Sequence, residues 1–130
     1  MSGVKAPHSV SSQKAPGAIG PYSQGVVAGN LLFISGQLPV DPATGAFVAG
    51  GIAEHAHQCL QNLSAISTAA GTSLERAVKV TVFLTDMGNF ATVNQVYGEY
   101  FKSNLPARSA VQVAALPKNA GIEIEAIVSL

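Results

Sequence analysis

The segment Val78-Lys-Val-Thr-Val-Phe-Leu84 sets the fold class of this chain. It is rich in β-branched and aromatic residues, which favour a β-strand. Segments with the apolar spacing of helices lie on both sides of it. We therefore expect a central strand that the chain reaches through a crossover helix.

The two flanking segments predict one helix each. In the first, over Ile52–Ala70, apolar residues recur every three or four positions, and the pattern stops at Gly71. In the second, aromatic and apolar residues recur at helical spacing over Phe90–Phe101, with Asp86 or Asn89 available as the N-cap. The central strand thus has a helix before it and a helix after it.

Two apolar runs predict strands near the start of the chain. These runs, Gln24–Ala28 and Leu31–Ser35, are joined by Gly29-Asn30, a pair that tolerates positive φ and predicts a hairpin. The following stretch, Pro39–Gly51, is rich in proline and glycine and predicts turns around at most a short strand near Phe47.

Two alternating segments near the end of the chain predict two further strands. Side chains alternate over Arg108–Ala115 and, after a turn over Leu116–Gly121, again over Ile122–Val128. The order ββ(β)αβαββ predicts an α+β domain with both helices on one face of the sheet. The other face would be apolar and in need of a partner.

Composition limits the class of protein. A chain of 130 residues with 48% hydrophobic content suits one compact domain over residues 1–130, with residues 1–13 expected to be a flexible N-terminal segment. The net charge is zero and no basic run is present, which argues against a nucleic-acid partner. Only 11% of residues are charged, against about 25% in most soluble proteins. We therefore expect an apolar surface covered by self-association.

Residues with metal-binding or redox chemistry are few. Cys59 is the only cysteine and lies in a helical pattern, so we expect a small buried hydrophobe rather than a disulfide. His55 and His57 lie two apart on a predicted helix, so their rings should point to different sides and be solvated, without a metal. No apolar run approaches the roughly 20 residues of a membrane span. We expect a cytoplasmic location, with organellar import left open.

Five short motifs carry a resemblance that extends from Lys14 to the C-terminus. They are Ala18-Ile-Gly-Pro-Tyr-Ser23, Ile34-Ser-Gly-Gln37, Phe90-Ala-Thr-Val-Asn94, Pro106-Ala-Arg-Ser109 and Ile122-Glu-Ile-Glu-Ala126. In order and spacing the chain resembles the RidA/YjgF/UK114 family. The resemblance implies a chorismate-mutase-like fold with a mixed six-stranded sheet, a homotrimer with a site in each subunit cleft, and enamine/imine deaminase activity.

The same resemblance implies a set of site residues. Arg108 would bind the substrate carboxylate and Glu123 would hold the water. The walls would be formed by Tyr22, Ser35, Gly36, Phe90 and Asn94. Bacterial members often carry cysteine two residues after the arginine, whereas this chain has Ala110, so any role of that position must be main-chain.

The residue types suit the hydrolysis of a 2-imino acid such as 2-iminopropionate to a 2-keto acid and ammonia. Arg108 is one of only two arginines, and its rigid fork of N–H donors matches a carboxylate. Glu123 could polarise a water aimed at C2, an action that typically contributes about 10²–10⁴-fold. This chemistry needs no cofactor and no metal.

Three function classes stay open. The first is the imine deaminase. The second is a ribonuclease or translation inhibitor. The sequence argues against it, because it shows neither a basic groove nor aromatic residues spaced to stack on bases. The third is a non-catalytic protein that binds small carboxylates or acts as a chaperone-like surface, which would have no need of Glu123. If the last two strands form a hairpin, Arg108 and Glu123 lie roughly 20 Å apart within one subunit, so a shared site needs two chains.

Overall fold

The computed structural model describes residues 6–130, so the first five residues of the segment expected to be flexible lie outside the described residues. In chain order the helices and strands are β1 (His8–Val10), β2 (Gly25–Ala28), β3 (Leu31–Gln37), α1 (Ile52–Ala69), β4 (Ala77–Leu84), α2 (Phe90–Tyr100), β5 (Ala107–Gln112) and β6 (Ile122–Ser129). Three short 3₁₀ helices are η1 (Leu74–Arg76), η2 (Met87–Asn89) and η3 (Pro117–Asn119).

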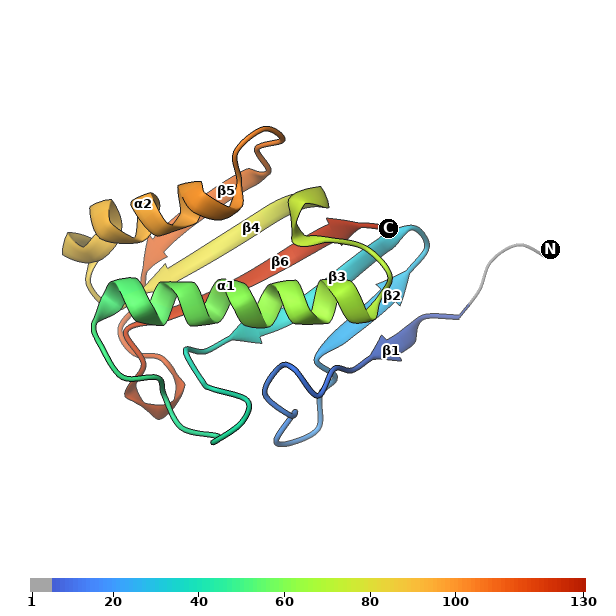
Figure 1. Ribbon diagram of the computed structural model, residues 1–130, viewed down its shortest axis with the longest axis horizontal. Helices are drawn as coiled ribbons and strands as arrows, with labels where there is room; N and C mark the ends of the chain where they lie inside the picture. Colours follow the sequence, from blue (N-terminus) through green and yellow to red (C-terminus); the bar gives the residue numbers. More distant parts are fainter. Residues whose placement is uncertain (1–5) are drawn as a thin grey trace.

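The strands form one mixed sheet in the order β1-β2-β3-β6-β4-β5, and both helices cover the same face of it (Figure 1). The β4–β5 pair is parallel and all other pairs are antiparallel. Helix α1 crosses from β3 to β4 and α2 from β4 to β5, so each helix joins strands that run in the same direction. The predicted six-stranded α+β fold is confirmed.

The core lies between the helices and the sheet. From β4, the side chains of Val80, Val82 and Leu84 are almost fully buried under the helices. The buried side of α1 is formed by Ala56, Cys59, Leu60, Leu63 and Ile66, as its apolar spacing predicted. Burial raises the pKa of the Cys59 thiol, which keeps it protonated and confirms the expected buried hydrophobe.

The sixth strand is not where the sequence placed it. Near Phe47 the structure has only an isolated bridge to Val40, whereas His8–Val10 forms strand β1 at the edge of the sheet. The expectation of a flexible segment over residues 1–13 therefore does not hold for these three residues. They pair with β2, and the buried amide of Gln24 holds the chain just beyond them, since the Ser12 N–H donates to Gln24 Oε1 at 2.6 Å.

The last two strands do not form the expected hairpin. Strand β5 pairs only with β4, in parallel, and β6 lies on the other side of β4, between β3 and β4. The crossover through α2 explains this order, because it returns the chain parallel to β4 and leaves the inner position free for β6. The estimate of roughly 20 Å between Arg108 and Glu123 assumed the hairpin, so its geometry was wrong.

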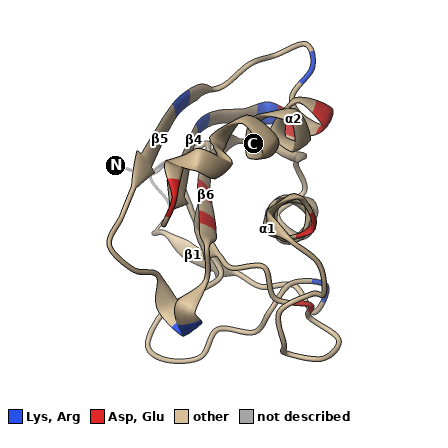
Figure 2. Ribbon diagram, turned by 90° about the vertical axis from the view of Figure 1, so that its left-hand side faces the viewer, with Lys and Arg blue, Asp and Glu red and all other residues tan. Residues whose placement is uncertain are grey.

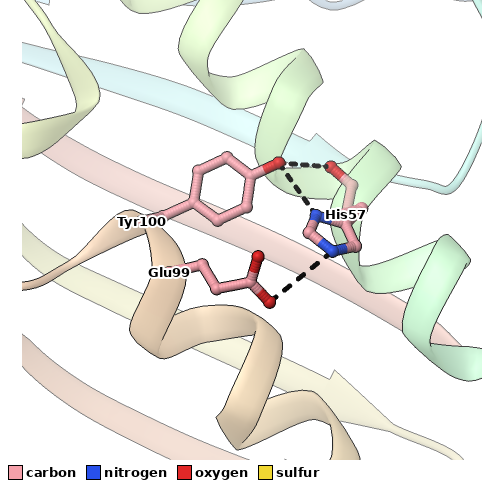
Figure 3. Close-up of polar contacts among 3 residues, drawn as sticks. All are labelled: His57, Glu99 and Tyr100. Carbon is pink, nitrogen blue, oxygen red and sulfur yellow. Dashed lines mark hydrogen bonds and ion pairs between the residues drawn. The ribbon is translucent and has the colours of Figure 1, made fainter.

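The two histidines of α1 are only partly solvated, because each ring also contacts a neighbouring group. His55 Nε2 lies 2.9 Å from the Val48 carbonyl oxygen. His57 lies between the helices, with Nδ1 at 3.2 Å from the Tyr100 hydroxyl and Nε2 at 3.8 Å from the Glu99 carboxylate (Figure 3). Both rings help to hold local structure: His55 ties α1 to the preceding loop, and His57 ties α1 to α2.

Neither helix covers the other face of the sheet, which lies on the left in Figure 2 with the helices on the right. Phe33 is 42% exposed and Val111 is 41% exposed. Each is paired across the sheet with a half-buried apolar residue, Phe33 with Ile127 and Val111 with Phe83. Among residues 6–130, neither helix is long and apolar enough to cross a membrane. The uncovered face is partly apolar rather than wholly apolar as expected, because Lys79 and Glu125 lie on it as well.

Candidate active site

Arg108 lies near the start of β5 and its side chain points toward α2. Its register partner in β4 is Val80, which faces the helices, and partners in a parallel pair share a face. The guanidinium donates from Nη1 to Asn94 Oδ1 at 2.8 Å. Its Cζ lies 5.2 Å from the ring centroid of Phe90 and 4.7 Å from that of Tyr97. The arginine therefore rests on one face of α2.

The sequence of α2 explains this arrangement. Phe90, Asn94 and Tyr97 are four and three residues apart, so they share one face of the helix. Within residues 6–130 the Arg108 guanidinium has no hydrogen bond other than that to Asn94, and its side chain is exposed. The other N–H donors of the fork are thus free to bind an anion.

Ala110 lies on the same face of β5 as Arg108, opposite Val82 of β4. Its methyl group packs against the core. Ala110 places no reactive side chain beside Arg108, so this position can act only through its main chain.

Four of the other expected site residues line one pocket on a different part of the molecule. They are Tyr22, Ser35, Gly36 and Glu123. The pocket has a volume of about 540 Å³ and includes loop residues that follow β1, β3 and β5. Those three loops lie at the same end of the sheet in Figure 1. The fold thus brings the expected site residues together in two groups, one around Arg108 and one around Glu123, rather than in one.

A bulge in β3 shapes the floor of this pocket. The register of β3 against β6 shifts between Ile34 and Gln37, which turns Ser35 and Gly36 out of the regular ladder. The Ser35 hydroxyl donates to the Ser23 carbonyl oxygen at 2.6 Å. A Cβ atom on Gly36 would overlap the Glu123 carboxylate, so only glycine lets this carboxylate pack against the main chain.

Tyr22 forms an exposed wall of the pocket. Its side chain is 53% exposed, and its loop is held from beneath by the buried side chain of Gln24. The Gln24 amide donates to the carbonyl oxygens of Ala15 and Pro16, at 3.3 and 2.6 Å. A buried amide with several backbone partners fixes a loop that has no regular structure of its own.

Glu123 is the acidic group of the pocket. Its neighbours Ile122 and Ile124 are fully buried under the helices, so Glu123 points to the opposite face of the sheet. Burial raises the pKa of the Glu123 carboxyl, and the like charge of Glu125 raises it further. A carboxylate with a raised pKa is a stronger base at neutral pH than an ordinary glutamate.

The sheet separates the two groups within one chain. Arg108 is paired with Val80 and Glu123 with Phe83, so they lie three positions apart along β4. This is about 10 Å along the strand, with about 10 Å more across two strand spacings, and the side chains leave opposite faces. One chain cannot bring both to one small ligand.

Two residues of these groups were missed by sequence reasoning. Tyr97 entered the sequence analysis only as part of the helical pattern over Phe90–Phe101, although its spacing of seven residues from Phe90 places it on the same helix face. Gln24 was assigned to an apolar strand run, and the sequence holds no signal that its amide is buried.

Comparisons with known proteins place the chain in a family. Residues 12–130 match the family model described as endoribonuclease L-PSP. The human 2-iminobutanoate/2-iminopropanoate deaminase is 55% identical over 118 residues, which cover 91% of this chain and 86% of that protein. A RutC family protein of Sinorhizobium fredii is 56% identical over 93% of this chain and 96% of its own length.

Solved structures agree with the fold. The crystal structure of Escherichia coli TdcF with bound serine superposes with a TM-score of 0.90 at 48% identity, covering 95% of this chain and 98% of that chain. Yeast Mmf1 superposes with a TM-score of 0.92 at 44% identity, with coverages of 95% and 98%.

Proposed function

This chain belongs to the RidA/YjgF family, and from that premise we propose that it hydrolyses 2-imino acids, the tautomers of 2-enamines, to 2-keto acids and ammonia. The chemistry of its two residue groups supports this activity. One group presents to an anion a guanidinium whose hydrogen bond to Asn94 is its only one among residues 6–130. The other presents a carboxylate with a raised pKa in a pocket. A human relative at 55% identity bears the name of this activity.

Arg108 binds the substrate carboxylate in this proposal. Asn94 holds one edge of the guanidinium, and the donors that remain can bind both oxygens of a carboxylate. The TdcF structure, with serine bound, is consistent with a site that accepts small molecules bearing a carboxylate. Phe90, beside the guanidinium, offers an apolar surface to the flat imine.

Glu123 activates the water. The carboxylate accepts a proton from a water molecule as the water oxygen bonds to C2 of the protonated imine. Glu123 returns that proton to the nitrogen of the tetrahedral adduct. As the C–N bond then breaks and ammonia leaves, the carboxylate accepts the proton of the hydroxyl group, which leaves the 2-keto acid, and it afterwards releases this proton to the solvent. The wall against which the substrate lies is formed by Tyr22, Ser35 and Gly36. Close packing against Gly36 fixes the position of the Glu123 carboxylate.

The site is completed by a second copy of this chain. The opposite-face arrangement of Arg108 and Glu123 is the observation that carries this part of the proposal. The exposed apolar side chains of Phe33 and Val111 on the uncovered sheet face support self-association. The homotrimer is taken from the family. Each site would then contain Arg108, Phe90 and Asn94 of one subunit and Tyr22, Ser35, Gly36 and Glu123 of its neighbour.

The direct test is ammonia release from freshly generated 2-iminopropionate by the purified protein. We expect release well above the spontaneous rate, and its loss in Arg108→Ala. Release at the spontaneous rate would contradict the deaminase. In that case RNA cleavage would favour the ribonuclease, and carboxylate binding without turnover would favour the non-catalytic protein.

A further inference from the structure

Tyr97 is a residue of α2 to which neither the family motifs nor the reaction above gives a role. Its ring centroid lies 4.7 Å from Cζ of Arg108, closer than the 5.2 Å of Phe90. Both distances are within the range over which an aromatic face attracts a guanidinium, which extends to about 6 Å. The arginine is thus held against two aromatic rings as well as by one hydrogen bond.

The Tyr97 ring is a fixed platform. Its side chain is only 7% exposed, and its centroid lies 4.5 Å from that of Phe101, which is itself buried. Asn94 is exposed by contrast and constrains only one nitrogen of the guanidinium. The orientation of the guanidinium plane therefore depends on the rings rather than on the hydrogen bond alone.

The hydroxyl of Tyr97 does not explain why a tyrosine stands here. Among residues 6–130 it is buried without a hydrogen-bond partner. An unpartnered buried hydroxyl lowers stability. Burial also raises the pKa of this phenol, with Arg108 acting in the opposite direction, so the group stays neutral and forms no ion pair with the arginine. The part of the Tyr97 side chain that contacts Arg108 is the face of the ring.

We propose that Tyr97 is a positioning residue, whose ring holds the Arg108 guanidinium in the plane from which its free N–H donors reach the substrate carboxylate. This inference rests on the proposed function, since it assigns the ring a role in substrate binding. It does not make Tyr97 a catalytic residue, because the hydroxyl is buried and does not reach the reacting atoms.

The test compares Tyr97→Phe, which keeps the ring, with Tyr97→Met and Tyr97→Leu, which replace it with flexible or branched apolar groups. KM and kcat are measured for 2-iminopropionate, and the Kd of pyruvate, a 2-keto acid product, is measured by NMR titration. For the two apolar variants we expect KM and Kd to rise about 3- to 30-fold, with a smaller change in kcat. Tyr97→Phe should match the unchanged protein.

Tyr100→Leu is the matched control. Tyr100 is also a tyrosine of α2, but it contacts His57 of α1 rather than Arg108. A general loosening of α2 would raise the Kd of pyruvate in this variant as well, and that result would overturn the proposal. An unchanged Kd in folded Tyr97→Met or Tyr97→Leu would also overturn it, as would an equal loss in Tyr97→Phe.

A second readout needs neither activity nor the apolar variants. The chain has three tyrosines, so the phenol of Tyr97 can be titrated by NMR with labelled tyrosine and assigned with Tyr97→Phe. Contact with the guanidinium predicts a higher phenol pKa in Arg108→Ala, and an unchanged pKa would overturn the inference. If the protein released no ammonia, the proposed function would fail, while pyruvate binding and this titration would still test the role of Tyr97.

Discussion

Arg108 and Glu123 stand on opposite faces of the same sheet, three register positions apart along β4. The guanidinium lies against one face of α2, and the carboxylate lies in a pocket on the other side of the sheet. The layer of strands between them is part of the folded core and cannot open to join them. A reaction that uses both groups must therefore take them from two different subunits.

Replacement of Arg108 by lysine should remove most of the deaminase activity. The lysine keeps the charge, but a point ammonium cannot reproduce the bidentate fork or lie flat on the rings of α2. Arg108→Ala should lower the deaminase activity further than Arg108→Lys does. The measurement is kcat/KM for 2-iminopropionate, and wild-type turnover in folded Arg108→Ala would refute the assignment.

Glu123→Gln should separate binding from chemistry. The amide has the size of the carboxylate but cannot accept the proton of water, so kcat should fall by about 10²–10⁴-fold. The Kd of pyruvate should change little, because the carboxylate of the ligand is bound by Arg108. Loss of pyruvate binding together with activity would mean that Glu123 is structural.

The pH dependence of the rate should follow the ionisation of Glu123. Only the ionised form accepts a proton, so the rate should fall as the pH drops through the pKa of this group. That pKa is raised first by burial and then by Glu125. Glu125→Gln removes the like charge, so the acid limb of the pH–rate profile should move to lower pH. A limb that stays in place or moves upward would contradict this assignment.

The same raised pKa predicts the sign of an effect on stability. The folded chain binds the proton of Glu123 more tightly than the unfolded chain does. Ionisation therefore destabilises the fold as the pH rises above the usual glutamate range. Glu123→Gln should for this reason be at least as resistant to urea at neutral pH as the unchanged protein. Its loss of activity can then be separated from unfolding.

Gly36→Ala should disturb the pocket without changing any functional group. A Cβ atom at this position would overlap the Glu123 carboxylate, which must then move. We expect kcat to fall while urea unfolding changes less than activity does. Gly17→Ala is the matched control, since Gly17 lines the same pocket but a Cβ there meets nothing within 4 Å. Equal effects of the two substitutions would argue against the close contact.

Much of the fold was predictable because the spacing of apolar residues along the chain indicates helices and strands. The stripe over Ile52–Ala70 became α1, which ends one residue earlier, and the alternation from Ile122 became β6. Gly29 takes the expected positive φ in the turn between β2 and β3. These features depend on neighbours within a few residues, and such neighbours are visible in a sequence.

Strand order was not predictable in the same way. Whether β6 pairs with β5 or enters between β3 and β4 depends on contacts between distant segments, and alternation is identical in both arrangements. Strand β1 was not predicted, because the three residues His8–Val10 are too few to show an alternating pattern. The expected site residues were named from motifs, but their division between two faces followed only from the register.

The most direct test of the two-subunit site mixes two inactive proteins. Arg108→Ala and Glu123→Gln are unfolded and refolded together in equal amounts, and ammonia release from 2-iminopropionate is compared with that of each variant refolded alone. Random mixing pairs an intact Arg108 with an intact Glu123 at about one interface in four, so we expect about a quarter of wild-type activity. Mixed oligomers, verified by mass, that remain as inactive as the separate variants would contradict the shared site.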